Sequence, residues 1–180
     1  MARVERYGPG EEATDFTPAD FVLTHRHHPI ARLIRVGQRW RFRGSDAVYA
    51  YWSHCALVVG GDGSLIEAES TGVRRSPISR YRKNEYHLVR LGNEMSPDGR
   101  RGAVEYAEAQ AGKAFGYLAL LGSAIFLLTG WPVRLMRRDH QICSGVVVHA
   151  LQKGGLLLDL DPELTLPADL AKRFDVRAQR

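Results

Sequence analysis

The sequence contains only two cysteines, Cys55 and Cys143, among its 180 residues. Two thiols cannot build the disulfide framework of a small secreted domain, and a reduced compartment is the simpler interpretation. The first ten residues also lack the apolar stretch that a signal peptide requires. We therefore expect a cytoplasmic protein, or one delivered by a route that needs no signal peptide.

The excess of basic over acidic residues is small. Lysine and arginine number 25 against 20 aspartates and glutamates, which gives a net charge of +5. This charge permits attraction to anionic lipid, but no nucleic-acid reader motif is present, so we expect no nucleic-acid partner. Hydrophobic residues make up 44% of the chain, which excludes wholesale disorder.

The order of turn signals and apolar patterns predicts a flexible leader over residues 1–17 and one domain over residues 18–180. The clearest element is a hairpin, in which residues 56–59 and 65–68 flank a turn of glycines and aspartate. Strands in the first half and helices in the second favour an α+β fold, with an antiparallel sheet packed against helices. The other predicted elements are strands at 20–24 and 86–91, and helices within 25–43 and at 98–113, 144–152 and near 167–170.

Cys143 is the candidate nucleophile. It lies at the predicted start of a helix, where unpaired N–H groups carry partial positive charge and favour thiolate over thiol. The alternative is a structural role, because a cysteine on an apolar helix is commonly a small buried hydrophobic residue.

A cysteine nucleophile needs a base and a group that orients the base. His54 begins the first strand of the hairpin, and its side chain should point to the side of Ala56 and away from Cys55. Glu67 and Glu69 share parity on the returning strand, so either carboxylate could lie near the imidazole and fix its tautomer. A histidine that faces water and a solvated glutamate are the ordinary alternatives.

Four runs stand in a fixed order along the chain: Ser53-His54-Cys55-Ala56-Leu57-Val58, Ile66-Glu67-Ala68, Pro77-Ile78-Ser79-Arg80-Tyr81 and Cys143-Ser144-Gly145-Val146-Val147. Together they resemble the permuted papain-like amidases, a circularly permuted branch of the NlpC superfamily related to the lecithin:retinol acyltransferase-like proteins. In that branch the chain order is histidine, acid, cysteine. The resemblance covers roughly residues 18–171.

The resemblance implies a permuted papain-like (NlpC-type) fold. It implies Cys143 as the nucleophile, His54 as general base and acid, and Glu67, favoured over Glu69, as the orienting acid. The implied activity is cysteine-dependent hydrolysis or acyl transfer on an amide or ester, through a thioester. The substrate stays open between a lipid ester and a peptidoglycan-type amide, and a non-catalytic ligand- or membrane-binding module on the same fold is the alternative.

Two further segments bear on partners and metals. Residues 114–133 carry no charge, which is compatible with a buried core helix, an interfacial helix or acyl-pocket wall, or a membrane span. Peripheral membrane contact is therefore among the expected interactions, beside a small-molecule, lipid or peptide substrate. The run His25-Arg26-His27-His28 fits no common zinc spacing, so it is predicted as a basic loop, and we expect neither metal nor cofactor.

Overall fold

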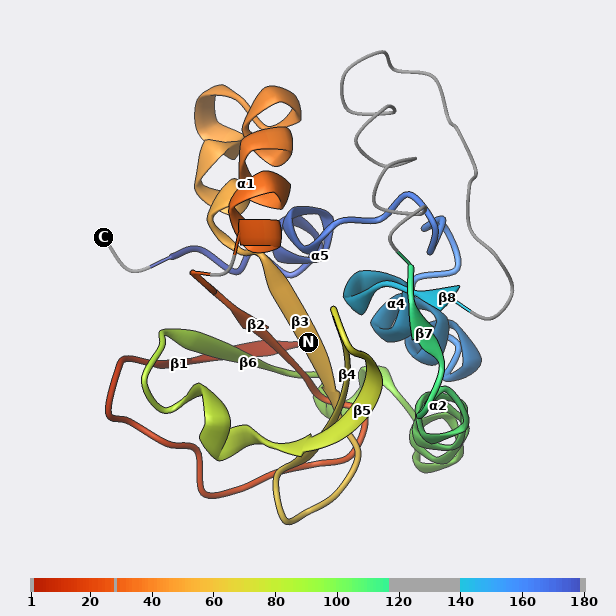
Figure 1. Cartoon of the computed structure of the whole chain (residues 1–180). Coiled ribbons are helices and arrows are strands. Elements are labelled where there is room, and N and C mark those ends of the chain that lie inside the picture. Colours follow the sequence, from red (N-terminus) through yellow and green to blue (C-terminus); the bar gives the residue numbers. More distant parts are fainter. Residues whose placement is uncertain (1, 28, 117–139, 179–180) are drawn as a thin grey trace.

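The structure is a computed structural model, and it describes residues 2–27, 29–116 and 140–178. Its centre is a six-stranded antiparallel sheet in the order β1-β6-β2-β3-β4-β5, and helices pack against it (Figure 1). The predicted α+β class, with an antiparallel sheet packed against helices, is confirmed.

The strands are β1 (Arg3–Tyr7), β2 (Phe21–Thr24), β3 (His54–Val58), β4 (Ser64–Glu69), β5 (Gly72–Pro77), β6 (Tyr86–Arg90), β7 (Ala114–Phe115) and β8 (His140–Gln141). The α-helices are α1 (Pro29–Arg41), α2 (Pro97–Ala109), α4 (Cys143–Lys153) and α5 (Pro167–Arg173), and the 3-10 helices are η1 (Gly44–Tyr51), η2 (Ile78–Tyr81) and η3 (Gly92–Glu94).

The predicted hairpin is present as β3 and β4, with Leu57 paired to Ile66. Its turn closes because Gly63 takes a positive φ of 77°, a conformation that glycine adopts without steric cost. The Asp62 side chain accepts a hydrogen bond from the Ser64 main chain at 3.0 Å, which stabilises the same turn. The turn fixes the register of the two strands that carry His54 and Glu67.

Alternation along β3 separates two buried clusters. Cys55 and Leu57 pack into the larger cluster with α2 and α4, whereas Ala56 and Val58 pack into a second cluster on the opposite face. The second cluster also contains Tyr81, which lies beside His54 with ring centroids 6.2 Å apart. The predicted parity, with Cys55 inside and His54 on the other side, is therefore confirmed.

Helix α4 forms because residues 143–153 form an apolar stretch with small residues in its first turn, and nearly all of them are buried. It packs against β3 and α2. The Ser144 hydroxyl donates a hydrogen bond to the Thr165 carbonyl at 2.6 Å and ties down the first turn. Gly145 permits close packing there, since an added Cβ would lie 3.1 Å from the Pro162 carbonyl oxygen. These contacts hold Cys143 against the start of β3.

The prediction of a flexible leader is wrong for residues 3–7, which form the edge strand β1 and pair with β6. Val4 and Tyr7 point to opposite faces of the strand, and each packs against one of the two buried clusters. Tyr7 stacks on Tyr86 at 5.0 Å, and Glu5 binds Arg90 at 2.8 Å. Packing of these two side chains orders a segment whose composition indicated a loose leader.

The uncharged run begins as strand β7, which pairs in parallel with β8. Val73 of β5 donates a hydrogen bond to the Lys113 carbonyl at 2.8 Å, and Gly72 leaves room for that approach, because a Cβ there would lie 2.8 Å from the same oxygen. Residues 117–133 of the run lie outside the described residues, so its three interpretations stay predictions. Within the described ranges, no helix has the length and apolar character needed to cross a bilayer.

Substitution of Leu57 by alanine tests the packing of β3 on α4. Leu57 is fully buried, so Leu57→Ala should lower the free energy of unfolding by about 2–5 kcal/mol, as cavity-forming substitutions do. Urea unfolding followed by circular dichroism measures the change. The exposed Leu158 is the matched control, and Leu158→Ala should change stability by less than about 0.5 kcal/mol. Equal effects of the two substitutions would contradict this packing.

Candidate active site

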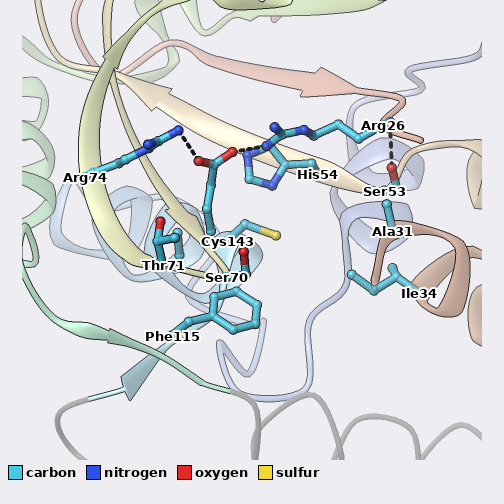
Figure 2. A pocket seen from close by; sticks show the side chains of 12 residues that line it. Arg26, Ala31, Ile34, Ser53, His54, Ser70, Thr71, Arg74, Phe115 and Cys143 are labelled. Carbon is cyan, nitrogen blue, oxygen red and sulfur yellow. Dashed lines mark hydrogen bonds and ion pairs between the residues drawn. The ribbon is translucent and has the colours of Figure 1, made fainter. Parts of the chain in front are cut away.

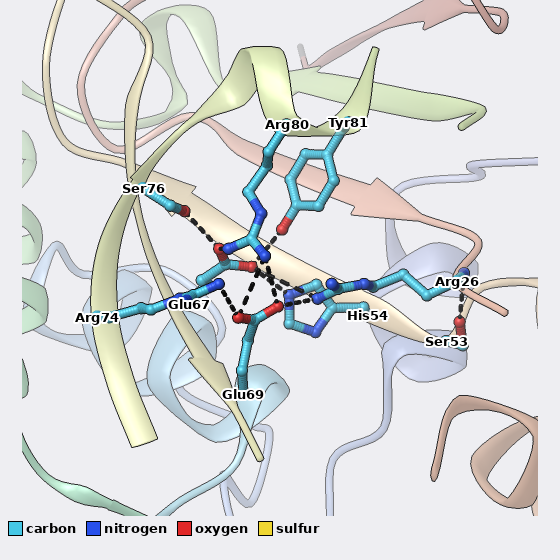
Figure 3. Close-up of polar contacts among 9 residues, drawn as sticks. All are labelled: Arg26, Ser53, His54, Glu67, Glu69, Arg74, Ser76, Arg80 and Tyr81. Carbon is cyan, nitrogen blue, oxygen red and sulfur yellow. Dashed lines mark hydrogen bonds and ion pairs between the residues drawn. The ribbon is translucent and has the colours of Figure 1, made fainter. Parts of the chain in front are cut away.

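The structure brings together the three site residues that the sequence predicts. The Nε2 atom of His54 lies 2.7 Å from Oε2 of Glu67, and the imidazole lines the same pocket as the Cys143 thiol, close enough for Cys143 to raise the pKa of the ring. All three side chains are buried. His54 and Glu67 come from neighbouring strands, whereas Cys143 comes from the N-terminal end of α4 (Figures 2 and 3). The imidazole therefore lies between a thiol and a carboxylate.

Strand register explains why Glu67 meets His54. Leu57 and Ile66 face each other on one side of the hairpin, so Glu67 projects to the other side together with His54. Glu69 has the same parity, but its carboxylate binds Arg26, Arg74 and Arg80 instead. Of the two glutamates that the sequence left open, Glu67 is thus the one in hydrogen-bond contact with the imidazole.

Four donors surround the Glu67 carboxylate (Figure 3). Ser76 and Arg80 donate to Oε1, while Tyr81 and His54 donate to Oε2. Burial raises the pKa of Glu67. The hydrogen bond and positive charge of His54, together with the hydrogen bonds from Ser76 and Tyr81, outweigh burial and hold the pKa well below its usual range. An ionised carboxylate accepts the Nε2 proton, so the ring must present Nδ1 to Cys143.

Two neighbouring side chains lower the pKa of Cys143. The Cys55 thiol lowers the pKa of Cys143, burial opposes that change, and the hydrogen bond and charge of His54 lower the pKa further. The net pKa of Cys143 is well below that of an ordinary thiol. Burial and the neighbouring Cys143 raise the pKa of Cys55 far above its usual value, so Cys55 stays protonated and can donate its S–H. The two cysteines are therefore not equivalent, because their pKa values are shifted in opposite directions.

The imidazole of His54 stays protonated at neutral pH. Burial lowers its pKa, but the hydrogen bonds and negative charges of Cys143 and Glu67 outweigh burial and raise the pKa to about 9. Between the lowered pKa of Cys143 and about pH 9, the pair is a thiolate and an imidazolium. The two shifts together favour a thiolate beside an imidazolium, which is the arrangement that a thiol nucleophile needs.

The N-terminal end of α4 adds positive potential at the sulfur. Ile142, the residue before the helix, provides no side-chain cap, so first-turn N–H groups beside Cys143 lack such a partner. These N–H groups and the helix dipole favour a negative charge at this position. The main-chain N–H of Cys143 is the expected donor to an oxyanion that would form if the Cys143 sulfur attacked a carbonyl carbon.

Cys143 and His54 open into a pocket of about 220 Å³ (Figure 2). One wall is polar and contains Arg26, Glu69 and Arg74. The other wall is apolar and contains Ala31 and Ile34 of α1 and Phe115 of β7. A pocket of this size holds the reacting portion of a substrate, and its two walls provide separate surfaces for a polar and an apolar substituent.

One group of possible metal ligands occurs within the described residues. His54, Glu67 and Glu69 place ligand atoms within 4.8 Å of one another. Their carboxylates already bind Arg26, Arg74 and Arg80. A divalent cation would have to displace these guanidinium groups, so the donor set fits the ion pairs better than it fits a metal.

The sequence prediction assigned no role to several residues that form part of the site. Ser76, Arg80 and Tyr81 bind Glu67, and Cys55 binds Cys143. Arg80 and Tyr81 belong to a run that carries the family resemblance, which was the available signal for them. Cys55 gave no such signal, because strand parity indicates only that it is buried. Arg26, from the run predicted as a basic loop, reaches Glu69.

Removal of the imidazole tests its effect on the sulfur. His54→Ala should bring the pKa of Cys143 toward the ordinary thiol value and slow its alkylation by iodoacetamide at pH 6 by about 100-fold. The alkylation rate of the wild type should rise with pH around a midpoint well below that of an ordinary thiol. Labelled peptides quantified by mass spectrometry separate Cys143 from Cys55. His149→Ala, on the same helix, is the matched control; an equal loss there, or none in His54→Ala, would contradict the ion pair.

The two glutamates can be separated by the titration of His54. Glu67→Gln should lower the pKa of the imidazole from about 9 by one unit or more, because it removes a hydrogen-bonded negative charge. Glu69→Gln should lower it by less than about 0.5 unit, since the Glu69 carboxylate binds arginines instead. Nuclear magnetic resonance of the labelled histidine ring measures both values. A larger shift in Glu69→Gln than in Glu67→Gln would contradict the assignment.

Comparison with known proteins adds no relative to this description. No family model matches the sequence, and no curated protein matches it. The side chains of the site are a buried thiol with a lowered pKa, an imidazole that lines the same pocket, and a carboxylate that holds the imidazole.

Proposed function

We propose that this protein is a cysteine-dependent hydrolase or acyltransferase that acts on an acyl amide or ester through a thioester on Cys143. The observation that carries the proposal is the buried His54, which lies between the Cys143 sulfur and the Glu67 carboxylate at the edge of a pocket. A structural cysteine does not need a protonated imidazole at its sulfur, and a structural histidine does not need a carboxylate that four donors keep ionised.

The first half of the reaction forms the thioester. The Cys143 thiolate attacks the carbonyl carbon, and the main-chain N–H at the start of α4 stabilises the resulting oxyanion. The carbonyl re-forms as the bond to the leaving nitrogen or oxygen breaks. The His54 imidazolium donates its Nδ1 proton to that leaving group, which departs as an amine or an alcohol.

The second half regenerates the thiolate. Neutral His54 takes a proton from water, or from the hydroxyl or amine of an acceptor, and this nucleophile attacks the thioester carbonyl. The carbon–sulfur bond breaks, Cys143 leaves as thiolate, and His54 is again imidazolium. Glu67 keeps the ring in one orientation through both halves and stays ionised.

We also propose that the α+β fold is the permuted papain-like arrangement. Its support is the position of the three groups: histidine at the start of a strand, acid on the next strand, and cysteine at the start of a helix packed on that strand. The chain order of histidine, acid and cysteine agrees with the resemblance.

The pocket restricts the substrate class only in part. Its apolar wall suits the acyl chain of a lipid ester, and its polar wall suits the charged groups of a peptidoglycan-type amide. Both substrates present an acyl carbonyl, and the same thioester chemistry serves both. Comparison of the two classes is therefore part of the test.

The test is turnover by the wild type and by Cys143→Ala on a lipid mixture and on a muropeptide mixture, followed by mass spectrometry. Wild-type protein should consume at least one component, and Cys143→Ala should be slower by at least about 1,000-fold. The wild type should also gain the mass of an acyl group on the peptide that contains Cys143.

Two results would contradict this function. One is Cys143→Ala with wild-type turnover on an accepted substrate. The other is a wild type that binds components of the mixtures without changing their mass, which would indicate a binding module. Circular dichroism of both proteins excludes loss of fold as the cause of lost turnover.

A further inference from the structure

Helix α1 presents an unpartnered apolar stripe to solvent. Within the described residues four large hydrophobic side chains are exposed, and three of them, Leu33, Val36 and Trp40, lie on α1. Their exposed fractions are 66%, 53% and 56%. Spacings of three and four residues place them in one line along the helix. Isolated exposed leucines are ordinary, but a continuous stripe that ends in a tryptophan is not.

The opposite side of α1 is fixed to the protein. Ala31 and Gln38, seven residues apart, are buried. The Gln38 amide donates to the Trp52 carbonyl at 2.7 Å and accepts from the Ala168 main chain at 3.0 Å. Because these hydrogen bonds set the rotation of the helix, the stripe cannot turn inward without breaking them. Figure 1 shows α1 projecting beyond the ends of the central strands β2 and β3.

The stripe is bordered by positive charge. No acidic residue occurs from His25 to Arg43. Arg32 and Arg39 are exposed beside the stripe, and Arg35 follows on the same flank. No salt bridge of the described residues reaches these three arginines, whereas Arg41, on the far flank, binds Asp169 at 2.9 Å. Burial is the largest cause that lowers the pKa of Arg35, and the positive charges of Arg39 and Arg32 lower it further, which agrees with the proximity of the three arginines.

We infer that α1 is an interfacial helix that docks this protein on an anionic lipid bilayer, with Leu33, Val36 and Trp40 entering the headgroup region and Arg32, Arg35 and Arg39 binding lipid phosphates. An apolar face, a tryptophan and arginines without acidic partners are the features that bind a helix in the plane of a charged membrane surface. The stripe alone would suit a second copy of the chain, but two such copies would bring six unneutralised arginines together.

Docking by α1 would also keep the pocket close to the membrane, on the side of the helix opposite the stripe. Ala31 and Ile34 of the same helix form part of the apolar wall of the pocket. The docking surface contains none of Cys143, His54 and Glu67, so it stands or falls independently of the proposed chemistry.

The experiment is co-sedimentation of the full chain with phosphatidylcholine vesicles, with and without about one third phosphatidylglycerol. The wild type should bind the anionic vesicles and lose binding on neutral vesicles or in high salt. Leu33→Ser/Val36→Ser/Trp40→Ser and Arg32→Gln/Arg39→Gln should each weaken binding by about tenfold or more. The matched controls, Leu158→Ser and Arg82→Gln/Lys83→Gln, alter exposed residues outside α1 and should bind within about twofold of wild type.

Fluorescence provides a second measurement. In a Trp131→Phe background, the protein should show a blue shift with anionic vesicles that is lost when Trp40 is also replaced by phenylalanine, because the remaining Trp52 is buried in the protein core. Absence of vesicle binding by wild type, or equal binding by the α1 variants and their controls, would overturn the inference. A dimer in sedimentation equilibrium that the triple serine substitution dissociates, without vesicle binding, would assign the stripe to a second copy instead.

Cys143→Ala should bind vesicles like the wild type. Vesicle binding without turnover would contradict the proposed reaction alone, and turnover on soluble substrates without vesicle binding would contradict the docking surface alone.

Discussion

A buried negative charge is the constraint on which the site depends. The Glu67 carboxylate is shielded from water, and an unpaired carboxylate in that position would cost several kcal/mol. Ser76, Arg80 and Tyr81 supply donors from β5 and η2, and His54 supplies the remaining one. Because the other donors come from fixed elements, the carboxylate has one orientation, and the imidazole takes the orientation that the carboxylate requires. The sulfur of Cys143 then meets the free ring nitrogen.

The sequence predicted those parts of the site that follow from local periodicity. The hairpin turn sets the register of β3 and β4, and alternation within it places His54 and Glu67 on one side and Cys55 on the other. Alternation could not separate Glu67 from Glu69, since both have the same parity. Their difference arises from side chains that approach from elsewhere in the chain, chiefly Arg26 and Arg74 on Glu69.

Long-range packing limited the rest of the prediction. Two adjacent arginines, Arg74 and Arg75, interrupt the alternation of apolar and polar residues in β5, so the sequence did not predict this strand. In the structure Arg74 binds Glu69 and Ser76 binds Glu67. Strand β1 is ordered by Tyr86 and Arg90, which lie some eighty residues away in the chain. The contact between Cys55 and Cys143 depends on how α4 packs on β3, and the exposure of the α1 stripe depends on Gln38, which binds residues of two other segments. No local pattern contains that information.

The proposed function depends most directly on the low pKa of the Cys143 thiol, which Cys55 and His54 lower. The most direct measurement is the ultraviolet absorbance of thiolate as a function of pH, taken as the difference between wild type and Cys143→Ser. The account predicts that this absorbance is already present at pH 7, with a midpoint well below the ordinary thiol pKa of about 8.5. A midpoint at or above that value would contradict the account, because Cys143 would then be an ordinary buried thiol.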